Sequence, residues 1–252
     1  MVLDRTFVLL DRVGDKTERR IWDQGIRTWD EFLDKDIVTH FSTKRKEAAD
    51  RTLKEAKVAM KLRATTFFSE RLHNRDIWRL YPTFSDDALF LDIETTGLSR
   101  HSAITVVGLA RGDHFRALVR GQDLTRAELD KEMTGARLIV TFNGASFDLP
   151  MLRSQFPVPQ LDAPHLDLRY IARHEGMSGG LKSIERQLGL DRDREFAMMT
   201  GEDAVRLWHM WERRGNQRAL DLLVRYNKAD VVNLRDVANI VCQQAAASTF
   251  PE

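Results

Sequence analysis

Apolar and polar residues in the first part of the chain recur with the period of amphipathic helices. Asp15 followed by Glu18 predicts a capping box that starts a helix over residues 16–24. Thr28 followed by Glu31 repeats this pattern and predicts a second helix directly after it. The chain therefore opens with a predicted pair of short helices.

The longest helix predicted near the amino terminus covers residues 42–63, which contain neither glycine nor proline. Its apolar residues recur at helical spacing and should face the interior: Ala49, Leu53, Ala56 and Met60. Four lysines fall on another face: Lys46, Lys54, Lys57 and Lys61. This second face is either a contact for a nucleic-acid backbone or plain solvated surface, and the pattern favours solvated surface.

The periodicity changes to that of strands after a turn-rich connector, Tyr81-Pro82 to Ser85-Asp86-Asp87. Three strands are predicted, over residues 88–93, 103–110 and 114–120. Gly112-Asp113 predicts a hairpin turn between the last two. A helix over 123–133 and a buried strand over 138–142 follow.

Helical periodicity returns after Asn143-Gly144 and continues almost to the end of the chain. The predicted helices cover residues 146–154, 166–174, 181–188, 202–213 and 218–243. An antiparallel meander followed by helical crossovers predicts an α/β fold with a mixed sheet flanked by helices. We therefore predict a small all-α domain over residues 1–83 and an α/β domain over residues 84–252.

The composition is that of a soluble globular protein, with 42% hydrophobic and 31% charged residues and a net charge of +1. The single cysteine, Cys242, excludes an internal disulfide and fits a reducing compartment. The apolar run Phe7-Val8-Leu9-Leu10 is too short for a signal peptide core or a membrane span. These features predict a cytoplasmic protein that does not contact membranes.

Two carboxylates stand at the end of a predicted core strand. Asp92 and Glu94 follow the apolar run Ala88-Leu89-Phe90-Leu91, and because they are two residues apart they point to the same side of the sheet. Two like charges at such a place repel and are costly to desolvate, and a bound cation relieves both effects. Carboxylate oxygens suit magnesium or manganese. The alternative is a polar strand end that runs into a turn.

Two further acidic positions strengthen the metal hypothesis. Asp148 falls in the first turn of a predicted helix after the strand at 138–142, where it could alternatively serve the helix dipole. Tyr226 and Asp230 are four residues apart on the last helix and so share a face, where they could alternatively be an ordinary surface pair. Considered together, these residues point to one site.

The order of these motifs resembles a known family. Asp92-x-Glu94-Thr95-x-Gly97, then Asn143-Gly-x-x-Phe-Asp148, then Tyr226-x-x-x-Asp230 are similar to the three exonuclease motifs of the DEDD, or DnaQ-like, 3′–5′ exonucleases. The tyrosine resembles the tyrosine-type subgroup. The stretches closest to the YprB-like branch are Trp78 to Pro82, Phe90 to Leu98, Leu181 to Glu185, and Tyr226 to Asp230. The resemblance spans about residues 76–243 and implies a ribonuclease H-like fold.

This resemblance implies a two-metal hydrolysis of phosphodiester bonds with Mg²⁺ or Mn²⁺. The implied metal ligands are Asp92, Glu94, Asp148 and Asp230, with Asp92 bridging both ions. Tyr226 is implied to orient the attacking water or to help remove its proton. The implied substrate contacts are Thr95, Thr96, Gly97, Leu98 and Asn143. The expected partner is single-stranded or 3′-ended DNA or RNA, and the sequence predicts no particular protein partner.

The segment from Phe7 to Leu33 resembles a helix-hairpin-helix motif, which binds the nucleic-acid backbone through N–H groups. Arg12 stands where the family has its first hairpin glycine, and Asp15 adds a negative charge near the expected phosphate. A purely structural helix pair is therefore the alternative. Lys182, after a Gly179-Gly180 turn, is either a phosphate contact or a surface lysine.

Two other functions remain compatible with the sequence. A non-catalytic nucleic-acid-binding protein on the same fold would be favoured by loss of a metal ligand, yet all four carboxylates and the tyrosine are present. An endonuclease would use the same metals and differ only in whether the groove closes beyond the terminal nucleotide. The prediction is a metal-dependent 3′–5′ exonuclease.

Overall fold

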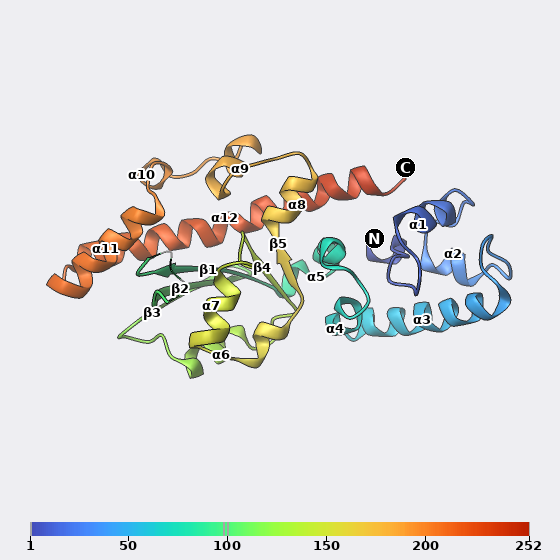
Figure 1. Cartoon of the computed structure of the whole chain (residues 1–252), viewed down its shortest axis with the longest axis horizontal. Helices are drawn as coiled ribbons and strands as arrows, with labels where there is room; N and C mark the ends of the chain where they lie inside the picture. The colour runs from blue at the N-terminus through green and yellow to red at the C-terminus, as the bar shows by residue number, and fades with distance from the viewer. Residues whose placement is uncertain (1, 98, 100, 252) are drawn as a thin grey trace.

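The computed structural model describes residues 2–97, 99 and 101–251. A helical region precedes a five-stranded mixed sheet that helices cover on both faces (Figure 1). The strands are β1 (Ala88–Thr95), β2 (Ile104–Arg111), β3 (His114–Val119), β4 (Leu138–Thr141) and β5 (His165–Asp167). The predicted fold class is confirmed.

The helices follow in chain order. Those ahead of the sheet are η1 (Leu3–Arg5), α1 (Asp15–Trp22), α2 (Trp29–Leu33), α3 (Thr43–Lys61), α4 (Thr65–Ser69), η2 (Asn74–Leu80), α5 (Tyr81–Phe84) and η3 (Ser85–Asp87). Those within and after the sheet are α6 (Arg126–Met133), α7 (Asp148–Gln155), η4 (Pro159–Asp162), α8 (Leu168–His174), α9 (Leu181–Gln187), α10 (Arg194–Ala197), α11 (Gly201–Arg214) and α12 (Gln217–Thr249).

The sheet has the strand order β3-β2-β1-β4-β5. The first three strands pair antiparallel, whereas β4 pairs parallel with β1 and β5 parallel with β4. Because β1, β4 and β5 run in the same direction, the loops that follow them meet at one edge of the sheet. The sequence prediction missed β5 and assigned most of it to a helix over 166–174, since three residues are too few to show a strand period.

Alternate residues of β1 face different layers, as the sequence predicted. Leu89, Leu91 and Ile93 pack with residues of α6 and α7 on one face. Phe90 belongs to the apolar cluster on the other face, where α12 lies. Asp92 and Glu94 have the parity of Phe90, so both carboxylates are on the α12 side of the sheet.

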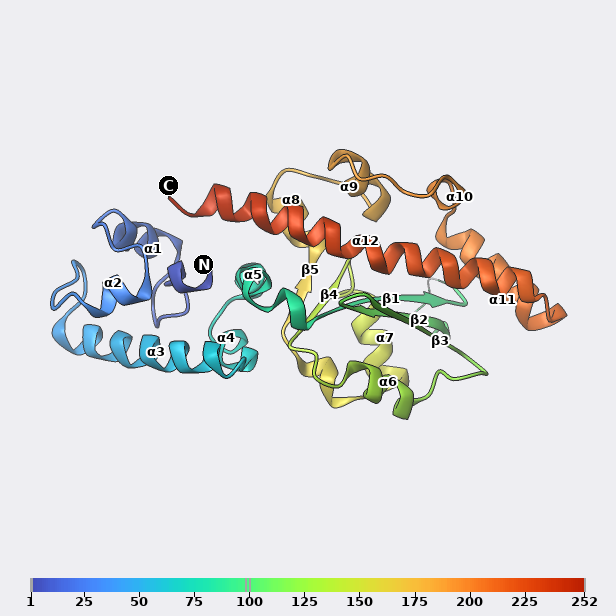
Figure 2. The ribbon, with the colours of Figure 1, turned by 180° about the vertical axis from the view of Figure 1, so that it is seen from behind.

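Helix α12 runs along the whole sheet and ends beside α1, as the views from the front and from behind both show (Figures 1 and 2). A tilted ring contact between Trp22 and Phe250, with centroids 5.3 Å apart, joins this end to the N-terminal region. None of the helices in the described part of the chain combines the length and the hydropathy that crossing a bilayer requires.

The capping box predicted at Asp15 is wrong. Helix α1 begins at Asp15 itself, Gly14 occupies the N-cap, and no side chain caps the helix. Glu18 is instead buried and accepts hydrogen bonds from the backbone N–H groups of Phe7 (2.6 Å) and Val8 (3.1 Å). The second predicted capping box, formed by the side chains at positions 28 and 31, is confirmed at the start of α2.

Helix α3 confirms the predicted helix over 42–63, with Ala49, Leu53 and Ala56 buried and Met60 partly buried. Its lysine face differs from the prediction at one position. Lys46 is buried, pairs with Asp50 (2.7 Å), and lies over the ring of Phe32. The expected connector after residue 80 is helical, and Tyr81 and Phe84 are buried within it.

Candidate active site

Three carboxylates from two elements meet beside the sheet. Asp92 and Glu94 come from the end of β1, and Asp230 comes from the middle of α12. One oxygen from each lies within 4.8 Å of the corresponding oxygens of the other two. The strand carboxylates Asp92 and Glu94 and the helix carboxylate Asp230 are therefore close together, as the sequence predicted. They form a set of hard oxygen donors.

Electrostatics make this trio unfavourable without a cation. At such separations two ionised carboxylates repel by roughly 3–4 kcal/mol per pair near a protein surface. Burial, together with the neighbouring carboxylates, raises the pKa of Asp92 and of Glu94 well above the ordinary range. All three donors are carboxylate oxygens, which are the ligands that magnesium and manganese prefer. The residues present thus fit a divalent metal.

Asp148 approaches the same pocket from the other side of the sheet edge. It is the first residue of α7, and its Oδ1 accepts a hydrogen bond from the backbone N–H of Ile93 (3.1 Å). This bond fixes the carboxyl beside the strand that carries Asp92 and Glu94. Burial raises the pKa of Asp148 to about 7. Asp148 lines the pocket but is outside the trio whose oxygens lie within 4.8 Å.

Tyr226 lies one helical turn before Asp230 and lines the same pocket. Burial, followed by the charges of Asp230 and Glu94, raises the pKa of its phenol. The hydroxyl therefore keeps its proton at neutral pH and is a hydrogen-bond donor. It forms no hydrogen bond with the part of the chain that the structure describes, so it is available to a ligand. Phe196 packs against its ring, with centroids 6.3 Å apart.

Asn227 holds Asp92 in place, a role that the sequence analysis did not assign. It is fully buried, and its Nδ2 donates to Asp92 Oδ2 (2.9 Å) and to the Asp92 carbonyl (3.3 Å). Gly108, opposite Asp92 in β2, makes this approach possible. A Cβ at Gly108 would lie 2.0 Å from Asn227 Oδ1 and 2.8 Å from Val231, so only glycine fits.

Arg192 is a second residue that the sequence analysis missed. Its guanidinium donates to Asp230 Oδ1 and forms two bonds with Glu185, of 2.7 and 2.9 Å. Asn233 Nδ2 donates to the same Glu185 carboxylate (2.8 Å). Arg192 and Glu185 are both buried, with side-chain exposures of 5% and 2%. The positive charge of Arg192 is thus in direct contact with Asp230, one of the three candidate metal ligands.

The pocket at this site has a volume of about 210 Å³. Of the residues expected to contact substrate, Thr95 and Asn143 line it. The hydroxyl of Thr95 donates to the Gly97 carbonyl (2.6 Å), and that of Thr96 accepts from the Ala103 N–H (3.0 Å), so both shape the turn after β1. Thr96 and Gly97 do not line the pocket. Leu98, also expected to contact substrate, lies outside the described residues.

Asn143 forms the turn between β4 and α7. Its backbone has φ +66°, a left-handed conformation that asparagine tolerates better than most residues. Its N–H donates to Asp167 Oδ1 (2.7 Å), and its side-chain oxygen accepts from Arg169 (2.6 Å) and Ser146 (3.0 Å). The next residue is also constrained, because a Cβ on Gly144 would lie 2.2 Å from Thr141 Oγ1.

Lys182 is not an ordinary surface lysine. Its ammonium donates to the carbonyl of Phe196 (2.8 Å) and to that of Met199. It also lies 4.9 Å from the centroid of the Tyr226 ring. Lys182 thus ties α9 to the segment around α10 beside the pocket. That segment includes α10 itself, a four-residue helix that the sequence analysis did not predict.

The comparisons with known proteins agree with this fold. A protein-family model described as the RNase H superfamily matches residues 89–242, more than half of the chain. Among solved structures, a family B DNA polymerase from the hyperthermophilic archaeon Pyrobaculum calidifontis is similar, with a TM-score of 0.51 and 17% identity. The similarity covers 65% of this chain and 26% of the polymerase chain, and at this identity it shows the fold alone. No curated protein matches the sequence.

Proposed function

The chain belongs to the RNase H superfamily, and from that premise we propose that it is a metal-dependent 3′–5′ exonuclease acting on DNA or RNA. The observation that carries the proposal is the approach of Asp92, Glu94 and Asp230 oxygens within 4.8 Å, in a pocket that Asp148 and Tyr226 also line. These five residues are the ones that resemble the tyrosine-type DEDD motifs and their YprB-like branch.

Each residue has a distinct task in the proposed reaction. Asp92, Glu94, Asp148 and Asp230 would hold two divalent cations, which would activate water and stabilise the leaving oxygen when bound. Tyr226 keeps its proton and would donate a hydrogen bond that orients the attacking water or a phosphate oxygen. Asn227 keeps the Asp92 carboxylate in one orientation, with Oδ2 as the hydrogen-bonded atom.

The pocket is small, with a volume of about 210 Å³, below the range of about 300–1,000 Å³ found for sites that enclose a drug-sized ligand. It suits the reacting phosphate and its cations. The choice of a single-stranded or 3′-ended nucleic acid as substrate rests on the resemblance to the 3′–5′ exonucleases.

Three features of the proposal stay predictions from the sequence. A division into a helical domain over residues 1–83 and a nuclease domain over residues 84–252 stays a prediction, as does the phosphate-binding role of the helix-hairpin-helix-like segment. A cytoplasmic location also stays a prediction, supported by the single, buried Cys242.

The reaction class is tested with single-stranded DNA and RNA labelled at the 5′ end, incubated with Mg²⁺, Mn²⁺ or EDTA and resolved to single nucleotides. We expect a ladder that shortens from the 3′ end and that EDTA abolishes. A closed circular single strand should survive. Cutting of the circle would assign an endonuclease, and binding without cleavage of either polymer would assign a non-catalytic binding protein.

A further inference from the structure

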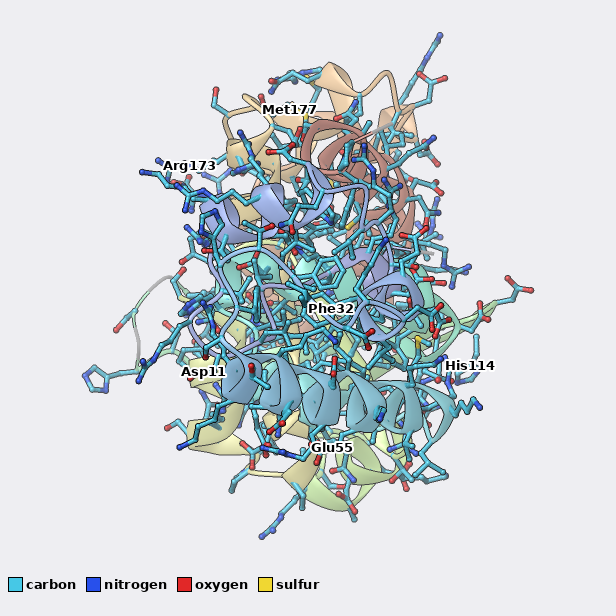
Figure 3. The ribbon with its side chains drawn as sticks, turned by 90° about the vertical axis from the view of Figure 1, so that its right-hand side faces the viewer. Asp11, Phe32, Glu55, His114, Arg173 and Met177 are labelled. Carbon is cyan, nitrogen blue, oxygen red and sulfur yellow. The ribbon has the colours of Figure 1, made fainter. Side chains whose placement is uncertain are left out.

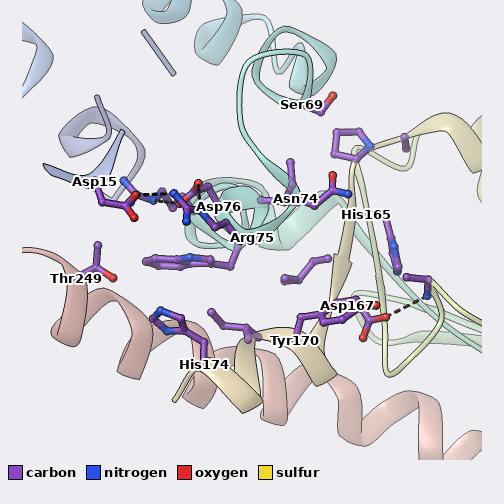
Figure 4. Close-up of a pocket in the computed structure, with 18 of the residues that line it drawn as sticks. Asp15, Ser69, Asn74, Arg75, Asp76, His165, Asp167, Tyr170, His174 and Thr249 are labelled. Atoms are coloured by element: carbon purple, nitrogen blue, oxygen red, sulfur yellow. Dashed lines mark hydrogen bonds and ion pairs between the residues drawn. The ribbon is translucent and has the colours of Figure 1, made fainter. Parts of the chain in front are cut away.

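A second cavity lies between the N-terminal helical region and the edge strand β5. Its volume is about 900 Å³, and its walls come from α1, η2, β5, α8 and the end of α12. Figure 4 places Tyr170 and His174 on one side of the opening and Asp15 and Arg75 on the other, where the last two pair at 3.0 Å. The cavity is near the upper end of the range of about 300–1,000 Å³ for ligand sites, so it has room for more than one nucleotide.

The loop between β4 and α7 separates this cavity from the active-site pocket. Asn143 and Phe147 line the pocket, whereas Ala145 and Leu149 line the second cavity. The loop is held rigidly, because Asp167 accepts the N–H groups of Asn143 (2.7 Å) and Ala145 (3.1 Å). A strand leaving the pocket needs to cross only this loop to reach the second cavity.

The exposed side of α8 carries cations and an aromatic ring between the two cavities. Arg169 donates to Asn143 Oδ1 (2.6 Å) at the loop, and Tyr170 and His174 follow it into the second cavity. Tyr170 is 58% exposed and is among the exposed large hydrophobic residues of the described chain. Arg173 extends outward from the same helix (Figure 3), and it forms no ion pair within the described residues.

The far wall is balanced in charge, because three arginines and three carboxylates of α1 and η2 line the cavity: Arg19, Arg75 and Arg79, and Asp15, Glu18 and Asp76. Arg19 of α1 lines the cavity and has no ion-pair partner among residues 2–97, 99 and 101–251. Glu18 and Asp76 are both bound by the buried Arg79, at 2.8 and 3.3 Å. Arg19 is exposed and lines the cavity, so it can reach an anionic polymer.

We propose that the α8 surface and this cavity hold the single-stranded part of the substrate upstream of the 3′ end in the active site. The inference rests on the proposed function. Arg169, Arg173 and Arg19 would contact phosphates, and the ring of Tyr170 would stack on a base. Stacking on an exposed ring requires an unpaired base, which selects a single strand over a duplex.

The test measures affinity against strand length. Fluorescence anisotropy with the full chain in EDTA would compare labelled single strands of about 4 and about 16 nucleotides, the range of sites on single-strand binders. The wild-type protein should bind the longer strand more tightly. Tyr170→Ala and Arg173→Gln should each lower the ratio of the two affinities at least about fivefold, the effect expected for loss of one stacked base or phosphate contact.

Two matched variants control this test. Tyr170→Phe keeps the aromatic ring and should keep the ratio, and Arg51→Gln removes an exposed arginine from α3, away from the cavity. An unchanged ratio in Tyr170→Ala and Arg173→Gln, or no length dependence in the wild type, would overturn the inference. Equal binding of a blunt duplex to the same surface would overturn the choice of a single strand.

Hydrolysis measured in parallel with Mg²⁺ separates this inference from the proposed function. Loss of the length dependence in the variants, with no hydrolysis by the wild type, would support the binding surface and reject the nuclease. Hydrolysis by the wild type, with the same affinity ratio in all variants, would support the nuclease and reject the surface.

Discussion

Burial raises the pKa of Asp148 to about 7 in the metal-free protein, whereas an aspartate in an unfolded chain titrates near 4. The native state therefore holds an extra proton between about pH 4 and pH 7, and the stability that this proton confers is lost as the pH rises through that window. A bound cation would remove this penalty, because it favours the ionised carboxylate.

Asp148→Asn should therefore flatten the pH dependence of stability. In EDTA, the free energy of unfolding of the wild type should fall more steeply from about pH 4 to pH 7 than that of the variant. Urea unfolding at several pH values measures both. Because the Asp148 charge also raises the pKa of Asp92 and of Glu94, the difference between the curves measures Asp148 together with its effect on these two carboxylates. Parallel curves would contradict the assignment of a buried, protonated Asp148.

Tyr226→Phe removes one hydroxyl from the pocket and leaves the ring packed on Phe196. Because the hydroxyl is proposed to act in the transition state, kcat should fall by on the order of 100-fold, while KM changes little. Steady-state kinetics on a labelled strand, with circular dichroism to verify the fold, provides the measurement. An unchanged kcat would exclude the tyrosine from the reaction.

Helices α9 and α12 are joined at the site by Arg192, whose charge offsets that of Asp230 and Glu185. Removing one partner from a buried ion pair costs about 3–5 kcal/mol, because the remaining charge stays buried. A divalent cation that binds only the native state would restore part of this loss. Arg192 is therefore a counter-ion for the metal-free site, and it holds Asp230 in one orientation.

Arg192→Gln should lower the Tm of the protein in EDTA and increase the rise in Tm on addition of Mn²⁺. Differential scanning fluorimetry across a Mn²⁺ titration measures both effects. Arg206→Gln, which removes an exposed arginine paired with Asp203, is the matched control and should behave as the wild type. The same Mn²⁺ response in Arg192→Gln and wild type would show that Arg192 does not influence the metal site.

Local patterns predicted the elements that have a clear period. The strands β1 to β4 and the hairpin at Gly112 were found this way, and so was the shared side of Asp92 and Glu94. Arg192 could not be found, because its pairing with Asp230 spans 38 positions and leaves no local signal. The spacing of Asp15 and Glu18 is compatible both with a capping box and with a Glu18 that pairs with a distant arginine in the interior. Because the sequence does not distinguish the two, the capping box was predicted wrongly.

The N-terminal region and the sheet share one apolar cluster, which runs from Leu3 through Trp78 and Phe90 to Val241. Phe250 at the end of α12 contacts the rings of Trp22 and of Trp78, with centroids 5.3 and 6.2 Å apart. Two regions joined by a common core are expected to unfold in one cooperative transition.

Glu18→Gln tests this coupling. Glu18 and Arg79 are 1% and 3% exposed, and breaking their pair should cost about 3–5 kcal/mol. Urea unfolding should show a single transition. Glu18→Gln should shift its midpoint by the same amount whether unfolding is followed by tryptophan fluorescence or by circular dichroism. Glu55→Gln on the exposed side of α3 (Figure 3) should stay within about 0.5 kcal/mol of the wild type. Two separate transitions, with only one affected by Glu18→Gln, would contradict a shared core.

The central claim is that the carboxylates around Asp92 form the metal centre of a nuclease. Its most direct test is hydrolysis of a 5′-labelled single strand by the wild type and by Asp92→Asn, in Mn²⁺ and in EDTA, with strand affinity measured in the same preparations. We predict that the wild type shortens the strand from its 3′ end in Mn²⁺ but not in EDTA. Asp92→Asn should not shorten the strand in either condition, although it should still fold and bind the strand. Equal hydrolysis by both proteins, or by the wild type in EDTA, would contradict the metal centre.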